Sequence, residues 1–489
     1  MESSWVEQVW PEQHLRRLMA SSTAVDSVVQ SCALQAGNQM LREDLLDMWA
    51  RAEPAPALAV RCQSSLVPIP GDDRGAARTR RLLLLTAGSR GDVEPFLALA
   101  RGASSRGHQV VVGATSSMTA GIGPQPFEVI VLDGDLGGLV AAQGVSPVTA
   151  LRSWRSTVHP ALRALLSSAV ATALDVRPDV ILAHPKLLSS SIAAAVLDVP
   201  HVLVETVPAL TPTGDFPAAG VASRDLGRRL NRLTYRATAG ATAVLGPDLR
   251  RLRMAHGLPL GTPSPSPAAV LCPVSPVLVP RPSDWPVNAH VTGSWHDTSG
   301  ARPDPEVDDF LARAEAAGAP VVVAGFGSMA TGLSDAQARS RAVVSAARTV
   351  NARVLVVTGW GGLDAEAARR AAGTEDEVLV VSSVSHAAVL PHADVVVHHG
   401  GAGTVHDVAR AGAVSIVVPF IADQPWWAMR LHHCGLTPRP LPATKLTADH
   451  LAHRLSLAPE HQRAARATAQ AMVGEQGTTQ AIDVLEQLT

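Results

Sequence analysis

Short runs of consecutive apolar residues, each followed by a segment with helical spacing, restrict the possible folds of this chain more than any other feature. A first series of runs occupies residues 81–86, 109–113, 129–132, 179–183 and 201–205, and a second occupies residues 320–328, 353–358, 377–381, 393–398 and 414–419. Strands without polar alternation that are joined by helices form parallel sheets covered on both faces. The sequence therefore predicts an α/β fold with two parallel sheets.

A proline-rich stretch separates the two series. Prolines recur between positions 263 and 286, and proline is excluded from the middle of a sheet because it has no backbone N–H. We expect one lobe at residues 79–260, a linker at 261–300, a second lobe at 301–455, and C-terminal helices at 456–489 that cross back to the first lobe. Residues 1–78 have weak hydrophobic periodicity and are predicted to be an N-terminal extension of unknown role.

Composition argues against several classes of protein. The net charge is −2 and the basic residues are scattered, so nucleic acid is not an expected partner. The four cysteines, Cys32, Cys62, Cys272 and Cys434, form no CxxC pair that would indicate a zinc ribbon. The chain has no run of 18 apolar residues and no signal-peptide pattern. We therefore expect a cytoplasmic protein without a transmembrane segment.

The strongest local signal is the glycine-rich turn at residues 398–404, which follows a buried-type strand and opens onto a helical segment. Glycines let the backbone approach phosphate oxygens, and a helix N-terminus offers unpaired N–H groups. His399 could donate a hydrogen bond to a phosphate without a metal. The alternative is a tight turn that needs small residues only for packing.

Two carboxylates follow other strands at the corresponding edge. Asp423 and Gln424 come after the run at 414–419 and could bind adjacent hydroxyls of a sugar; alternatively, Asp423 caps the next helix. Asp92 follows the run at 81–86 and could take a proton from a hydroxyl group, or it could be an N-cap. Ligands collect at the carboxyl edge of open α/β sheets, which favours the functional interpretations.

Other catalytic patterns are missing from the sequence. There is no HExxH, no GxSxG, no GxGxxG after a strand, and no DxD after a strand of the second lobe. The only lysines, Lys186 and Lys445, lie outside any P-loop pattern. Metalloprotease, serine hydrolase, dehydrogenase and P-loop chemistry are therefore not expected.

Four segments together resemble family 1 glycosyltransferases of GT-B fold, in the branch of the bacterial natural-product (glycopeptide and macrolide) enzymes and sterol glucosyltransferases. They are GSRGDVEP at 88–95, GFGSM at 325–329, HHGGAGT at 398–404 and DQPWW at 423–427. The resemblance covers about residues 80–485 and implies two Rossmann-like lobes that face a cleft. By this resemblance, residues 79–260 bind the acceptor and residues 301–455 bind the donor.

The resemblance also implies the reaction and its residues. An inverting transfer is expected from a UDP- or dTDP-sugar to a hydroxyl of a hydrophobic small molecule, with no metal or other cofactor. Asp92 would be the catalytic base. The donor-binding residues would be Ser89, Ser328, Val384, His399, Gly401, Gly403, Thr404, Asp423 and Gln424.

Several questions stay open at this level. Asp407 could contact the ribose, and Trp360 could lie near the base or pack in the core. Loops at 154–159 and 211–226 are expected to build the acceptor pocket. A nucleotide-sugar epimerase or hydrolase on the same fold, or a non-catalytic partner protein, are the alternative functions. The oligomeric state is expected to be a monomer or homodimer.

Overall fold

The structure is a computed structural model that describes residues 79–134, 154–260, 265–296, 302–327, 329, 333–374 and 376–488. All of these residues belong to one compact unit. The extension predicted at 1–78 lies outside the described residues. Within the described part of the chain, no helix has both the length and the apolar character needed to cross a membrane.

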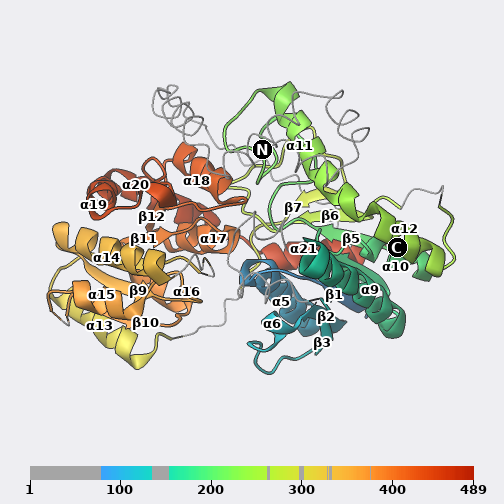
Figure 1. The fold of residues 1–489 in the computed structure, drawn as a ribbon, viewed down its shortest axis with the longest axis horizontal. Coiled ribbons are helices and arrows are strands. Elements are labelled where there is room, and N and C mark those ends of the chain that lie inside the picture. The colour runs from blue at the N-terminus through green and yellow to red at the C-terminus, as the bar shows by residue number, and fades with distance from the viewer. Residues whose placement is uncertain are drawn as a thin grey trace, which may run out of the picture. The chain divides into compact units, whose positions relative to one another are not determined.

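The first lobe is built on a parallel sheet of seven strands in the order β3-β2-β1-β4-β5-β6-β7 (Figure 1). The strands are β1 Arg81–Leu85, β2 Gln109–Thr115, β3 Glu128–Leu132, β4 Val180–Ala183, β5 His201–Val204, β6 Ala269–Cys272 and β7 Ala289–Val291. The helices of eight or more residues are α5 Arg90–Ser105, α9 His159–Val176, α10 Ser190–Leu197, α11 Arg228–Thr242 and α12 Gly246–Ala255. A short helix, α6, spans Ser116–Thr119.

Alternate residues of β1 explain why both faces of this sheet are covered. Leu82 and Leu84 join a buried cluster that includes α5, whereas Leu83 and Leu85 join a second buried cluster that includes α9. Successive side chains of a strand point to opposite faces, and burial of each leucine contributes roughly 1.5–3 kcal/mol. The unbroken leucine run therefore requires helices on both sides.

The second lobe contains a parallel sheet of five strands in the order β10-β9-β8-β11-β12. These strands are β8 Val321–Gly325, β9 Arg353–Val357, β10 Val378–Val381, β11 Val395–His398 and β12 Val414–Val417. Its helices include α13 Pro305–Ala316, α14 Leu333–Thr349, α15 Ala365–Ala371, α16 His386–Val389, α17 Ala402–Ala411 and α18 Gln424–His433. The last helices are α19 Ala448–Ser456, α20 Ala458–Met472 and α21 Gly477–Gln487. The two-sheet prediction is confirmed.

The proline-rich range 261–300, expected to be a linker, contributes β6 and β7 to the first sheet. Both strands are free of proline: Pro267 precedes β6 and Pro273 follows it, while Pro286 precedes β7. The prolines therefore limit the length of these strands without preventing their pairing. The edge position of β7 also suits a short strand.

The C-terminal helix crosses back to the first lobe, as predicted. Ile482 and Leu485 of α21 are buried in the cluster that contains Phe96 and Leu99 of α5. Arg106, which follows α5, forms an ion pair of 2.6 Å with Asp483. The chain end is therefore part of the core of the first lobe.

Candidate functional site

Both sheets place the predicted residues at the point where the order of the strands reverses. In the first sheet, Asp92 follows β1, and the neighbouring strand β4 leads into His184 and Lys186. In the second sheet, Gly327 follows β8, and His399 follows the neighbouring strand β11. Ligands of open α/β sheets bind in the crevice outside such strand ends. Each lobe therefore offers one ligand-binding edge.

The carboxylate of Asp92 lies among donors from two strand ends. Its Oδ2 accepts hydrogen bonds from the backbone N of Ser89 at 2.7 Å, from Ser89 Oγ at 3.0 Å and from Lys186 Nζ at 2.8 Å. His184 Nε2 lies 3.1 Å from the other oxygen. Ser89 is the N-cap of α5, and Asp92 stands at the third helical position. Asp92 thus helps to start the helix from its third position, so the N-cap interpretation is wrong for Asp92 itself, and its role as a base stays a prediction.

His184 is buried and oriented by its own chain. Its Nδ1 accepts the backbone N–H of Lys186 at 3.2 Å, so the ring proton is assigned to Nε2, which faces Asp92. Burial lowers the pKa of His184. A neutral imidazole therefore donates to the carboxylate and has no free nitrogen for an incoming substrate.

The environment of Asp92 strongly favours its ionised form. Burial alone would raise its pKa, but the charge of Lys186 and the hydrogen bond from His184 outweigh burial and hold the pKa well below its usual range. Asp92 is consequently an anion at any physiological pH. The same contacts make it a weak base until one of its donors is replaced.

Gly88 explains how Asp92 and Lys186 can meet. Its φ of +134° is rarely adopted by other residues, and a Cβ at this position would collide with Asp92 Oδ2 and Lys186 Nζ. The glycine therefore leaves the space that the ion pair occupies.

In the second lobe, the two histidines of the glycine turn have separate surroundings. His398 is buried, and its Nδ1 accepts the N–H of Gly400 at 3.2 Å. His399 lies against Gly327 and Gly401, where a Cβ would crowd its ring. Burial, with a smaller effect of His386, lowers the pKa of His399 to about 4. His399 is thus neutral at pH 7 and able to donate one hydrogen bond.

The start of α17 has the features of an anion site. Gly401 is its N-cap, and Gly403 and Thr404 lie in its first turn. A Cβ on Gly403 would meet nothing within 4 Å, so there is open space beside the turn. The N–H groups and the positive end of the helix dipole are available to a phosphate group there.

Asp423 and Gln424 lie together at the start of α18 but differ in their roles. Asp423 holds the N-cap position without a side-chain capping bond, so capping does not account for it. Gln424 is 5% exposed, and its Oε1 accepts the N–H groups of Phe420 and Ile421. Ala422, which lies between Ile421 and Asp423 in the same loop, has a φ of +56°. Gln424 therefore shapes the strained loop that presents Asp423.

The pKa of Asp423 is shifted in the direction opposite to that of Asp92. Burial, together with the negative charge of Asp92, raises it to about 6, and Lys186 acts in the other direction. Gly220 of the first lobe also approaches this segment: a Cβ on it would lie 3.9 Å from the backbone N of Asp423. Asp92, Lys186 and Asp423 therefore influence one another electrostatically.

The remaining predicted residues have mixed outcomes. Ser328 lies outside the described residues. Val384 is half-buried in the loop between β10 and α16. Asp407 pairs with His386 Nδ1 at 2.7 Å. Trp360 is 47% exposed after β9, so it does not pack in the core.

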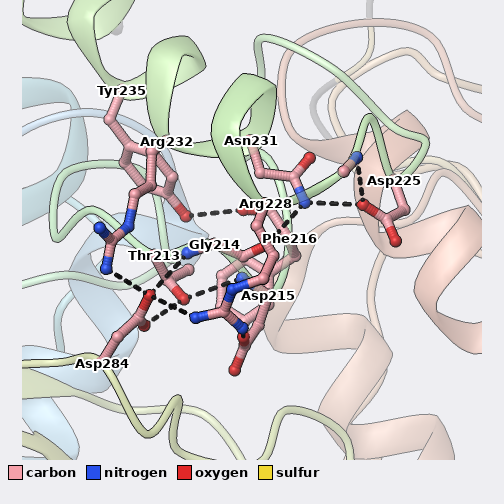
Figure 2. A network of polar contacts seen from close by, with 11 residues as sticks. Thr213, Gly214, Asp215, Phe216, Asp225, Arg228, Asn231, Arg232, Tyr235 and Asp284 are labelled. Carbon is pink, nitrogen blue, oxygen red and sulfur yellow. Dashed lines mark hydrogen bonds and ion pairs between the residues drawn. The ribbon is translucent and has the colours of Figure 1, made fainter.

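The loop expected at 211–226 is fixed by the polar network in Figure 2. Asp284 accepts hydrogen bonds from Thr213 Oγ1, Gly214 N and Arg232. Burial opposes ionisation of Asp284, but these hydrogen bonds outweigh it and lower its pKa to about 2. Farther along the loop, Trp426 of α18 donates to Pro217 O at 3.0 Å. The loop is therefore held from both sides.

Sequence reasoning missed His184, Lys186 and Asp284 as parts of the site. The segment 184–186 directly follows a correctly predicted strand, and Lys186 is one of two lysines in the chain, so a signal existed. Asp284 offered none, because its partners at 213–232 are far away in sequence. In the part of the chain that the structure describes, no group of three or more His, Cys, Asp or Glu side chains could hold a metal ion.

Comparisons with known proteins agree with this architecture. Residues 82–209 match the glycosyltransferase family 28 N-terminal domain, and residues 341–487 match the erythromycin biosynthesis protein CIII-like C-terminal domain. Among solved structures, the glycotransferase of kitacinnamycin has a TM-score of 0.61 at 20% identity, covering 84% of this chain and 100% of its own. The glycosyltransferase VinC in complex with dTDP has a TM-score of 0.58 at 20% identity, covering 83% and 98%. The fold is therefore the two-lobed GT-B fold.

Curated relatives define the family. The O-mycaminosyltylonolide 6-deoxyallosyltransferase of Streptomyces fradiae is 33% identical over 83% of this chain and 97% of its own length. A sterol 3-beta-glucosyltransferase of Arabidopsis thaliana is 29% identical over 82% of this chain and 67% of its own. The chain belongs to this family of glycosyltransferases. It spans 30% of the length of the related Aspergillus clavatus sterol 3-beta-glucosyltransferase.

Proposed function

We propose that this glycosyltransferase moves a sugar, with inversion, from a UDP- or dTDP-sugar to a hydroxyl of a hydrophobic small molecule. The observation that carries the proposal is that the segment of Asp423 packs against the first lobe, which carries Asp92: Trp426 donates to Pro217 O at 3.0 Å, and a Cβ on Gly220 would lie 3.9 Å from Asp423 N. Burial and the charge of Asp92 together raise the pKa of Asp423, which agrees with this arrangement. The names of the relatives support the acceptor class, because one acts on a tylonolide derivative and others on sterols. Complexes of neighbouring structures with dTDP support the donor class.

In the proposed reaction, the acceptor hydroxyl attacks the anomeric carbon in line with the departing diphosphate. The new bond joins the acceptor oxygen to the anomeric carbon while the bond from that carbon to the phosphate oxygen breaks. Asp92 receives the hydroxyl proton. A single displacement of this kind inverts the configuration at the anomeric carbon.

The surroundings of Asp92 set the timing of the proton transfer. Four hydrogen atoms point at its oxygens, from Ser89 N, Ser89 Oγ, Lys186 and His184, so the free carboxylate is a weak base. The hydroxyl becomes acidic only as its oxygen bonds to carbon. The proton therefore moves late, when even a weak base can accept it.

The leaving nucleoside diphosphate would be stabilised by the second lobe. Neutral His399 donates one hydrogen bond, and the first N–H groups of α17, at Gly403 and Thr404, supply others. Asp423 would accept hydrogen bonds from hydroxyl groups of the sugar, whereas Gln424 acts on the loop that carries Asp423. Ser89, Ser328, Val384 and Gly401 complete the proposed donor contacts.

The Asp92→Asn variant tests the catalytic proposal. The amide keeps the size of the side chain but cannot take a proton, so transfer should fall by about 100-fold or more, while binding of the nucleoside diphosphate stays unchanged by calorimetry. Glu94→Gln, on the exposed face of α5 where Glu94 pairs with Arg90, is the matched control and should retain transfer. Wild-type turnover of Asp92→Asn with its best acceptor would exclude Asp92 as the base.

The donor alone provides the second arm of the test. A stable donor in the absence of an acceptor supports transfer, whereas a changed sugar configuration or free sugar would indicate epimerisation or hydrolysis. We also predict that chelating agents leave the transfer rate unchanged, since the proposed stabilisation of the leaving group uses His399 and backbone N–H groups. The cytoplasmic location and the monomeric or homodimeric state stay predictions.

A further inference from the structure

Lys186 is a rare residue type in this chain and lies at the ligand-binding edge of the first sheet. The chain has only two lysines, and Lys186 follows β4 at the switch point of the first sheet. Its Nζ lies 2.8 Å from Asp92 Oδ2, and its side chain is still 44% exposed. The ammonium group therefore reaches both the buried carboxylate and the space in front of it.

A second carboxylate, that of Asp423, lies on a segment that packs against the lobe of Lys186. The start of α18 is held against the first lobe, because Trp426 donates to Pro217 O and Gly220 approaches the backbone of Asp423. The electrostatic influences on Asp423 from other side chains include the charges of Asp92 and Lys186, with opposite signs. Lys186 is thus paired directly with Asp92, and its charge also favours the ionised form of Asp423.

We propose that Lys186 is a positioning residue of the transfer site: its ammonium group holds the Asp92 carboxylate and balances the charges of Asp92 and Asp423 together. The proposal rests on the proposed function, in which Asp92 faces the acceptor and Asp423 the sugar.

Simple electrostatics gives the reason for such a residue. Two neighbouring carboxylates without a cation share a proton, because like charges raise the pKa of one of them. Both proposed roles need an ionised carboxylate: Asp92 accepts a proton, and Asp423 accepts hydrogen bonds from sugar hydroxyls. The positive charge of Lys186 allows both carboxylates to be ionised at neutral pH.

The local structure supports a positioning role over simple charge. His184 holds Oδ1 of Asp92 while Lys186 and Ser89 hold Oδ2, so the plane of the carboxylate is fixed. Gly88 keeps the space of the ion pair free. The side chains that contact Asp92 are Lys186 and His184 after β4 and Ser89 at the start of α5. Those that influence Asp423 include Asp92, Lys186 and Trp427 of α18.

The experiment compares Lys186→Met and Lys186→Arg with the wild type across pH. In the wild type, kcat/KM should fall below a pH near 6, as Asp423 is protonated. Lys186→Met should move this acid limb upward by about one to two pH units, because an opposite charge is removed. Lys186→Arg should return the limb towards its wild-type position. Lys445→Met changes the other lysine, which is exposed, and should reproduce the wild-type profile.

A lysine with only a structural role would give a different result. Its loss would lower kcat/KM by the same factor at every pH, so the acid limb of Lys186→Met would stay where it is in the wild type. That outcome would overturn the proposal, and so would a shifted limb that Lys186→Arg does not return towards the wild-type position.

A measurement without turnover separates this proposal from the proposed function. Protein labelled with ¹³C at lysine Cε has two lysine signals, and Lys445→Met identifies that of Lys186. The chemical shift of this signal should change as Asp423 is protonated, with a midpoint near pH 6. Asp423→Asn should abolish this change. A Lys186 signal that does not change between pH 5 and pH 7.5 would contradict the proposal. Failure of every donor and acceptor pair in the wild type would instead contradict the proposed function.

Discussion

At the scale of single residues, the two proposed carboxylates lie in opposite environments. Asp92 has an adjacent cation and several hydrogen-bond donors, so its pKa is held far below the usual range. Asp423 is buried and feels the negative charge of Asp92, so its pKa rises to about 6. Groups whose environments separate their pKa values in this way concentrate at functional sites. One carboxylate is thus always charged, and the other titrates near neutrality.

The Asp423→Asn variant tests the role of the titrating carboxylate. In the wild type, Asp423 becomes protonated below a pH of about 6 and loses the negative charge that strengthens its hydrogen bonds from sugar hydroxyls. The kcat/KM for the donor should therefore decline as the pH falls. In Asp423→Asn, the KM for the donor should rise at pH 8, and the decline near pH 6 should disappear. Initial rates at varied donor concentration and pH measure both effects. A decline that persists in the variant would assign it to another group.

The sequence predicted some of these residues and not others for a clear physical reason. Asp92, His399 and Asp423 each lie within a few residues after a predicted strand, and parallel strands bring their carboxyl ends to one edge of a sheet. Lys186 also follows a strand, but its role depends on Asp92, which lies 94 positions away. A charge pair at that separation is decided by the order β1-β4 of the sheet, which no local pattern contains.

At the scale of elements, local patterns were informative for strands and less so for loops. Every apolar run named from the sequence overlaps a strand, whereas β6 and β7 went unnoticed because prolines surround them. The Pro-rich range even supplies Asp284, which anchors the loop at 213–214 (Figure 2). Such anchoring requires the folded sheet and could not be read from composition.

The Asp284→Asn variant should loosen the loop expected to contact the acceptor. Asp284 has a side chain only 13% exposed and loses its charge-assisted bonds to Arg232 and Thr213 on substitution. We expect a cost of about 1–3 kcal/mol in unfolding free energy, a higher KM for the acceptor and an unchanged KM for the donor. Steady-state kinetics with each substrate varied in turn would measure the difference.

Arg229→Met, an exposed change on the same helix as Arg232, is the control for the loop. Its kinetic constants should equal those of the wild type. An equal rise in both KM values in Asp284→Asn would mean that the network supports the lobes generally rather than the acceptor loop.

At the scale of the whole molecule, the two sheets share packing through chain segments that cross between them. One continuous buried cluster contains Phe216 and Trp285 from the first lobe with Trp426 and Trp427 from α18. His406 of α17 accepts the N–H of Ser275, which follows β6. The C-terminal helix α21 then packs on α5. These contacts predict that the lobes do not unfold independently.

The Ile482→Ala variant tests the contribution of α21 to this coupling. Ile482 is 1% exposed, and Gly102 of α5 lies so close beneath it that a Cβ there would come within 3.2 Å of its side chain. Truncation should cost about 2–5 kcal/mol, because the lost apolar contact leaves a cavity that a glycine cannot fill. In urea unfolding followed by circular dichroism, the whole transition should shift to lower urea. Gln480→Ala, an exposed change on the same helix, should leave the midpoint unchanged. A separate early transition in Ile482→Ala, with the main midpoint unaltered, would show that α21 detaches alone and does not couple the lobes.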